Sequence, residues 1–316
     1  MAIHTVSPKI RPSRQTGKLG FRNLIPILWG FTESDFATFA VPNTIFGILG
    51  ALSGAFAADD EGVPPSSLRD IALRIPLILA FNWCNLLIFD MANQRSPISV
   101  VEDATNKPWR PIPSSKITPD QTRRVMLAVI PISLCFHSFL GLWNYGLGIV
   151  AGIWVYNDLG GGDEIFLREM VIALGYYVFN LGSLRIALGS QTQVSAKGNL
   201  WTMIISGVVL TTMQIQDLKD QEGDRLRGRR TIALFLGESF SRRSIAFFVG
   251  FWACICTWFW DSPVLICLPM IALSFLVMWR VLVRRGVSED RWTWQIWCFW
   301  HSCFYLLPLI ELFGSS

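Results

Sequence analysis

Charged side chains are scarce in this chain. Only 16% of its 316 residues are Asp, Glu, Lys or Arg, whereas about a quarter is usual in soluble domains. Hydrophobic residues make up 52%, the mean hydropathy is +0.41, and 14 Trp and 22 Phe would coat a soluble domain with apolar patches. A disordered, collagenous or disulfide-rich secreted protein is therefore excluded, and an integral membrane protein is predicted. The small net charge of +4 gives no support to a nucleic-acid partner.

The cysteine patterns of zinc sites and disulfide frameworks are also missing. The seven cysteines lie in apolar stretches, with no CxxC motif and no histidine at metal-ligand spacing, so they are interpreted as small buried residues. The N-terminal segment is basic but lacks the short apolar core and cleavage site of a signal peptide. We expect residues 1–33 to be a cytosolic tail and residues 34–316 to be a single transmembrane domain, with no obligate protein partner.

Apolar stretches of about twenty residues, the length that crosses a bilayer as a helix, recur along the chain. They predict an all-α protein that the lipid bilayer surrounds. Nine such stretches are found: 34–57, 70–93, 124–141, 143–158, 168–189, 199–217, 243–261, 263–283 and 292–312.

Basic residues mark one side of this predicted topology. Segment 94–123, after span two, carries five Lys or Arg, and segment 218–242, after span six, carries six. The loop 58–69 carries three acidic residues and a single arginine. Because Lys and Arg collect on the cytosolic side of membrane proteins, we expect the N-terminus and both long connecting segments to be cytosolic. The alternative is that one weak span does not cross.

Three carboxylates share one predicted helix face in QIQDLKDQEGDRLRGRRTIA, residues 214–233. Asp217, Asp220 and Asp224 are spaced i, i+3 and i+7 at the expected cytosolic end of span six. Like charges this close repel unless water or a cation compensates them, and carboxylate oxygens suit Mg²⁺. Lys219, Arg225 and three further arginines supply positive charge for an anion. The alternative, a solvated run of charges beside the membrane, is disfavoured by the helical spacing.

A weaker polar cluster, NWCNLLIFDMANQ, lies at the end of span two. Asp90 and Asn93 share a helix face, and Asn82 and Asn85 lie one or two turns deeper. Such groups are costly in a membrane helix unless they face a wet cavity, where their oxygens can complete a Mg²⁺ shell. The alternative is hydrogen bonding between helices. The two clusters together favour one shared cavity.

The segment RSPISVVEDATNKPWRPIPSSKIT follows the weaker cluster. Its prolines at 108, 111 and 113 predict an ordered, non-helical cap. Lys107 and Arg110 are candidate contacts of a diphosphate. The alternative for both is anchoring to lipid headgroups.

These motifs resemble those of the UbiA superfamily of intramembrane prenyltransferases. The resemblance covers nearly the whole chain: nine spans, acidic helix ends after the second and sixth, and the elements WRPIPSSKIT and DLKDQEGDRLRGRRT. It implies nine helices around a central cavity, cytosolic cap loops after helices two and six, and Mg²⁺ ions that hold a prenyl diphosphate. The positions that match metal ligands are Asp90, Asn93, Asp217, Asp220 and Asp224. The positions assigned to diphosphate contacts are Asn43, Lys107, Arg110, Lys219 and Arg225.

The first motif departs from the family pattern NDxxDxxxD. Asp90 and Asn93 take its place, and the third acidic position is either Glu102 or Asp103. This variant is similar to the fungal UbiA-type terpene cyclases, in which the substrate's own double bonds attack the allyl cation left by the departing diphosphate. The alternative is a prenyltransferase that moves the prenyl group to an aromatic acceptor. Farnesyl and geranylgeranyl diphosphate are both open as substrates, and the endoplasmic reticulum membrane is the expected compartment.

Span five supplies the remaining candidates. Tyr176, Tyr177 and Asn180 make it more polar than its neighbours, and aromatic faces stabilise carbocations. In the prenyltransferases this region resembles a tyrosine followed by a lysine, which Asn180 would replace. The alternative for each tyrosine is ordinary membrane packing. A transporter is disfavoured because transport sites lie near the bilayer midplane, whereas both clusters here lie at the same end of the spans.

Overall fold

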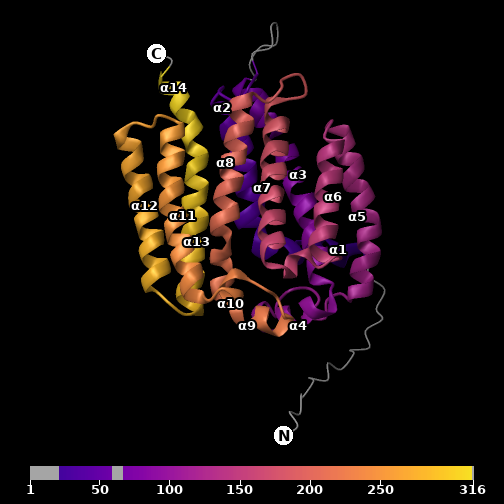
Figure 1. Cartoon of the computed structure of the whole chain (residues 1–316). Coiled ribbons are helices and arrows are strands. Elements are labelled where there is room, and N and C mark those ends of the chain that lie inside the picture. Colours follow the sequence, from indigo (N-terminus) through magenta and orange to yellow (C-terminus); the bar gives the residue numbers. More distant parts are fainter. Residues whose placement is uncertain (1–20, 59–66, 315–316) are drawn as a thin grey trace.

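Long helices stand side by side in this protein, and the short helices α4 (Pro97–Asn106), α9 (Asp217–Arg227) and α10 (Ile232–Phe235) lie across one end of them (Figure 1). The structure, a computed structural model, describes residues 21–58 and 67–314. Residues 1–20 of the expected tail and the acidic loop residues Asp59, Asp60 and Glu61 lie outside the described residues. The regular elements described are all helices, which confirms the prediction of an all-α protein.

The helices follow the predicted apolar stretches. The longer ones are α1 (Phe21–Asp35), α2 (Val41–Leu52), α3 (Leu68–Gln94), α5 (Pro119–Phe139), α6 (Trp143–Asn157), α7 (Ile165–Leu188), α8 (Ala196–Thr212), α11 (Glu238–Phe259), α12 (Val264–Val283) and α13 (Val287–Cys303). The short ones are α4 (Pro97–Asn106), α9 (Asp217–Arg227), α10 (Ile232–Phe235) and α14 (Glu311–Gly314). Within residues 21–58 and 67–314, five helical segments are long and apolar enough to cross a membrane: Leu24–Leu52, Leu68–Gln94, Ile165–Leu188, Ala196–Arg227 and Val264–Val283.

The first apolar stretch begins earlier than expected and is broken in the middle. Helix α1 starts at Phe21, so residues 21–33 of the expected tail are helical. A π-helical turn, Phe36–Ala40, then leads into α2, whose first turn holds Pro42. Proline has no backbone N–H to donate, so one helical hydrogen bond is missing near Pro42. The local change from the α-helical to the π-helical hydrogen-bond pattern accommodates this missing bond. The Asn43 side chain donates to the Phe39 carbonyl over 2.9 Å and so caps a group in the irregular turn.

The cap after α3 is partly helical, which corrects the expectation of a non-helical segment. Helix α4 begins with Pro97, in the first turn, where a proline leaves no additional backbone acceptor unpaired. Only the stretch from Lys107 to Thr118, which holds the three other prolines, is irregular. Helix α9 ends at Arg227 and is followed by Gly228, whose φ of 77° is the left-handed conformation that favours glycine.

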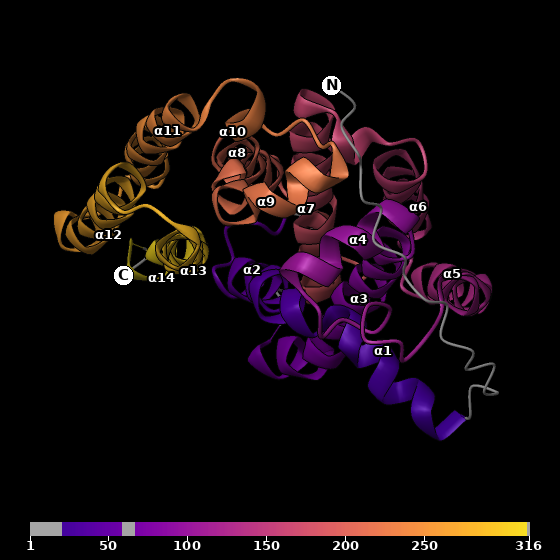
Figure 2. The same ribbon diagram turned by 90° about the horizontal axis from the view of Figure 1, so that it is seen from below.

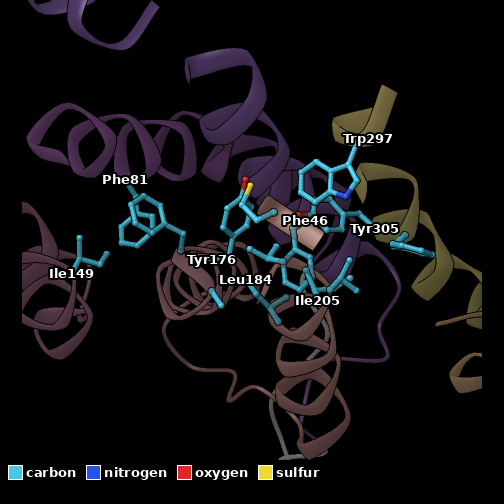
Figure 3. Packing of buried hydrophobic residues seen from close by; sticks show 14 of the residues in the cluster. Phe46, Phe81, Ile149, Tyr176, Leu184, Ile205, Trp297 and Tyr305 are labelled. Atoms are coloured by element: carbon cyan, nitrogen blue, oxygen red, sulfur yellow. The ribbon is translucent and has the colours of Figure 1, made fainter. Parts of the chain in front are cut away.

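Large apolar side chains from four parts of the chain meet in the core. Figure 3 shows Phe46 of α2, Tyr176 of α7, Ile205 of α8 and Trp297 of α13 converging on one cluster. The closest approach of α2 and α7 is at Gly47, where an added Cβ would lie 2.6 Å from the backbone of Ser183. Small residues allow such close helix packing in membranes. The contact fixes α7, which carries part of the cavity described below.

Replacing Gly47 by alanine is expected to destabilise the protein by about 1–3 kcal/mol, because the methyl group meets backbone that has no room to move. Thermal unfolding in detergent measures the effect. The matched control is Gly148→Ala in α6, where an added Cβ meets nothing within 4 Å and helix propensity favours alanine by up to about 1 kcal/mol. Equal melting temperatures for the two variants would contradict the packing argument.

Candidate active site

A cavity of about 640 Å³ lies among the helices at the end covered by α4 and α9. These two short helices lie beside each other in the view from below (Figure 2). A cavity of this volume is in the range that binds small molecules. Its polar lining residues near α4 and α9 are Asp35, Thr38, Asp90, Asn93, Glu102, Lys107, Arg110, Tyr156, Arg168, Gln216, Asp217, Asp220, Asp224 and Arg229. Aliphatic and aromatic residues one to three turns deeper along α6 and α7 line the rest, among them Ile149, Ile153, Val171, Leu174, Tyr176 and Phe179.

The three carboxylates of α9 all line this cavity, as their helical spacing predicts. Both oxygens of Asp217 accept hydrogen bonds from Arg168, at 2.7 and 2.9 Å. Asp224 accepts one from Arg229 at 2.8 Å, and Asp220 pairs with the adjacent Lys219. Each carboxylate thus has a cationic partner, which offsets the repulsion that the sequence alone implies.

The residues of α3 divide between the cavity and the helix interfaces. Asp90 and Asn93 line the cavity, and Asn93 donates to Asn157 over 3.1 Å. Asn82 instead donates to side chains of α2 and α7, and Asn85 lies 3.0 Å from a ring nitrogen of His137. The interpretation of Asn82 and Asn85 as links between helices therefore fits their contacts, whereas Asp90 and Asn93 line the cavity.

The irregular segment after α4 places two cations at the mouth. Lys107 and Arg110 line the cavity, and Arg110 donates to Asp103 at 2.9 and 3.1 Å and to Asp35 at 3.0 Å. Burial lowers the pKa of Lys107 from its usual value, with a further contribution from Arg110. Burial likewise raises the pKa of Asp103, although Arg110 acts in the opposite direction. Asp103 is tied to Arg110 and does not line the cavity; Glu102 does.

Five candidates from the sequence do not line the cavity: Asn43, Tyr177, Asn180, Lys219 and Arg225. Asn180 is fully buried among the helices. Arg225 is exposed and donates to Gln221 of its own helix over 3.2 Å. Lys219 lies beside the mouth, with its Nζ 6.0 Å from the ring centroid of Trp294. Tyr176 lines the cavity, as predicted.

Five polar lining residues were not among the candidates from the sequence: Asp35, Thr38, Tyr156, Arg168 and Gln216. Asp35 lies at the end of α1 and pairs with Arg110. The signal for Arg168 is an arginine at the start of an apolar span, directly before a glutamate. Such a residue must pair with something, and a charged residue inside a span marks a functional position by default.

The donor atoms at the mouth fit a Mg²⁺ site in their chemistry. The five predicted metal ligands, which carry carboxylate or amide oxygens, all line the cavity. Within the described part of the chain, the Oδ2 atoms of Asp90 and Asp224 are buried and have no hydrogen-bond partner. No group of three or more acidic, His or Cys residues there is already gathered at metal-binding geometry. A metal ion bound by Asp217, Asp220 and Asp224 would therefore have to replace their present cationic partners.

Comparison with known proteins assigns the chain to a family. It is 27% identical to the fumagillin beta-trans-bergamotene synthase af520 of Aspergillus fumigatus, over 78% of this chain and 88% of that protein. It is also 27% identical to the diterpene cyclase eriG of Hericium erinaceus, over 87% of this chain and 85% of that protein. Prenyltransferases are among the other relatives that match.

Solved structures of UbiA homologs share the fold. The solved structure of a UbiA homolog from Archaeoglobus fulgidus bound to GPP and Mg²⁺ superposes with a TM-score of 0.57, at 14% identity, over 91% of this chain and 98% of that one. The apolar helices and this likeness identify an integral membrane protein. The model of the UbiA prenyltransferase family matches residues 23–303, and the chain therefore belongs to the UbiA prenyltransferase family.

Proposed function

We propose that this protein is a membrane-embedded class I terpene cyclase, which ionises farnesyl or geranylgeranyl diphosphate with Mg²⁺, cyclises the carbocation and releases diphosphate. The observation that carries the proposal is the composition of the cavity. Carboxylates and cations gather at its mouth, and an apolar, partly aromatic wall continues behind them. The cyclases among the relatives favour the same reaction.

The mouth has the groups that bind and orient a diphosphate. Asp90, Asn93, Asp217, Asp220 and Asp224 are the proposed metal ligands. When bound there, Mg²⁺ supplies positive charge that stabilises the diphosphate as a leaving group. Lys107, Arg110 and Arg229 line the same space and contact the phosphate oxygens in this proposal. Arginine suits the role because its planar fork matches phosphate geometry.

The deeper wall suits a carbocation. Phe39 lies edge-on to Tyr176 and to Phe179, with ring centroids 4.9 and 4.7 Å apart, and all three residues line the cavity. Ring faces attract positive charge, most strongly where water is absent. The aliphatic residues Ile149 and Ile153 exclude water, which would otherwise capture the cation before the ring closes.

We further propose that the protein spans the endoplasmic reticulum membrane nine times, with its cavity mouth and N-terminus in the cytosol. The support is the charge distribution: segments 94–123 and 218–242, around α4 and α9, carry eleven Lys or Arg, whereas the loop 58–69 carries one, and basic segments stay on the cytosolic side. The mouth then opens toward soluble diphosphate substrates and Mg²⁺.

The second candidate is transfer of the prenyl group to an aromatic acceptor. Prenyltransferases among the relatives favour it, and the metal and diphosphate residues would serve it equally well. The two reactions differ only in what captures the cation. The decisive assay therefore leaves the acceptor out.

Incubation of the purified protein with Mg²⁺ and either farnesyl or geranylgeranyl diphosphate, without acceptor, is expected to give a cyclic hydrocarbon or terpene alcohol. Mass analysis of a hexane extract detects the product and identifies the chain length. Chelation of the metal should remove it. Intact diphosphate recovered until an aromatic acceptor is supplied would reject the cyclase in favour of the prenyltransferase.

A further inference from the structure

Arg168 donates hydrogen bonds to both carboxylate oxygens of Asp217, the first acidic residue of α9. Nη1 and Nη2 donate to Oδ2 and Oδ1 of Asp217 at 2.9 and 2.7 Å, and the side chains of both residues are almost fully buried. Two parallel bonds between a guanidinium and a carboxylate make a strong and geometrically specific contact. The pair joins α7 to α9 at the mouth of the cavity.

Arg168 is also attached to a second carboxylate that does not line the cavity. Nη1 donates to Glu169 Oε1 over 2.7 Å, and Glu169 is buried beside it at the start of α7. Among the residues described, Arg168 Nε and Glu169 Oε2 have no hydrogen-bond partner. If the hydrogen bonds to Asp217 break, the hydrogen bond to Glu169 still holds Arg168 in place. The Nε–H group of Arg168 is available to donate to a further acceptor.

A metal ion and Arg168 compete for the same oxygens of Asp217. A Mg²⁺ ion needs carboxylate lone pairs in near-octahedral geometry, and both oxygens of Asp217 already accept from the guanidinium. If the metal takes Asp217, the guanidinium loses its partner inside a buried site, which is costly unless another anion replaces it. A diphosphate oxygen that enters together with the metal is such an anion.

We propose that Arg168 is a diphosphate-binding residue that changes partner, from Asp217 to the diphosphate, when Mg²⁺ and diphosphate bind together. Before that exchange it keeps Asp217 from taking Mg²⁺ alone, and Glu169 holds it in position throughout. This inference rests on the proposed metal and diphosphate site. It predicts that Mg²⁺ and diphosphate bind together. The site then binds little Mg²⁺ in the absence of diphosphate.

Isothermal titration of the full-length protein in detergent separates the two roles. One titration uses Mg²⁺ alone, and the other uses inorganic diphosphate at a fixed excess of Mg²⁺. In R168Q the competitor for Asp217 is gone, so Mg²⁺ alone should bind about tenfold more tightly. Diphosphate should bind about tenfold to a hundredfold more weakly, because a charged donor is lost. A purely structural role would weaken both.

Two further variants keep the test informative if R168Q does not fold. R168K retains the positive charge but cannot make the bidentate contact with Asp217. It should change the affinities for Mg²⁺ alone and for diphosphate in the same directions as R168Q, by smaller factors. E169Q removes the second carboxylate that pairs with Arg168. The interaction of Arg168 with Asp217 should become stronger, so Mg²⁺ alone should bind more weakly. The matched control is R124Q, which removes an exposed arginine that pairs with Asp120 at 2.9 Å, outside the cavity lining.

Unchanged or weaker binding of Mg²⁺ alone in R168Q, or in R168K if R168Q does not fold, would overturn the inference. The outcome for the proposed function is separate. If the wild-type protein fails to bind diphosphate at any Mg²⁺ concentration, the proposed site itself is wrong. If the wild-type protein binds diphosphate with Mg²⁺ and the Arg168 variants behave like R124Q, only the partner exchange is wrong.

Discussion

Product formation is expected to fall by at least about 10²-fold when Asp220 is replaced by asparagine, because the change removes a proposed metal ligand. Asp220 lines the cavity, and its ion-pair partner is the adjacent Lys219 on the same helix. Its side chain is 26% exposed, so losing that pair costs about 0–1 kcal/mol of stability. The variant should therefore insert and fold normally. Extraction of terpene product and a melting curve, measured on the same preparation, separate the two properties.

A matched control removes an equivalent carboxylate away from the cavity. Asp120→Asn at the start of α5 breaks an exposed pair with Arg123 and Arg124 and should leave product formation unchanged. Asp224→Ala should also abolish turnover, but it is a less clean variant because Asp224 is fully buried against Arg229. Retained activity in both Asp220→Asn and Asp224→Ala would refute the assignment of the metal site to α9.

The local part of this site could be predicted from the sequence. Asp217, Asp220 and Asp224 lie within one short helix, and a spacing of three and four residues fixes their common face wherever the helix lies. The same holds for Asp90 and Asn93 at the end of α3. The break near Pro42 was also foreseeable, since a proline inside a helical run leaves a carbonyl without its donor.

The contacts between residues far apart in the sequence could not be predicted from the sequence. Arg168 lies 49 residues before Asp217, and Asp35 lies 75 residues before Arg110, so each pair depends on which helices become neighbours. The wrong face was expected for Asn180 for a related reason. Helix α7 packs against α2, α3, α6 and α8, and its second half, which holds Asn180, is buried on nearly every side. Such a segment has no polar stripe to show which face meets the cavity.

The second large effect concerns a buried ion pair that does not line the cavity. Arg242 of α11 donates to Asp290 of α13 over 2.8 Å, and both side chains are 2% exposed. The same guanidinium donates to the backbone carbonyls of Val281 and Arg284 at 2.9 and 3.2 Å. One side chain thus joins α11, the end of α12 and the start of α13, without lining the cavity.

Arg242→Ala is expected to destabilise the protein by about 3–5 kcal/mol, because Asp290 is left buried and uncompensated. Melting in detergent measures the loss, and the surviving protein should make the same terpene as wild type. Arg285→Ala, which removes an exposed arginine 4.0 Å from Glu238, is the control and should cost at most about 1 kcal/mol. The double variant Arg242→Met with Asp290→Leu should recover much of the loss, since apolar residues can replace a buried pair. Its recovery stays incomplete because the two carbonyls still lack their donor. A melting temperature for Arg242→Ala equal to that of Arg285→Ala would show that α11, α12 and α13 hold together without this pair.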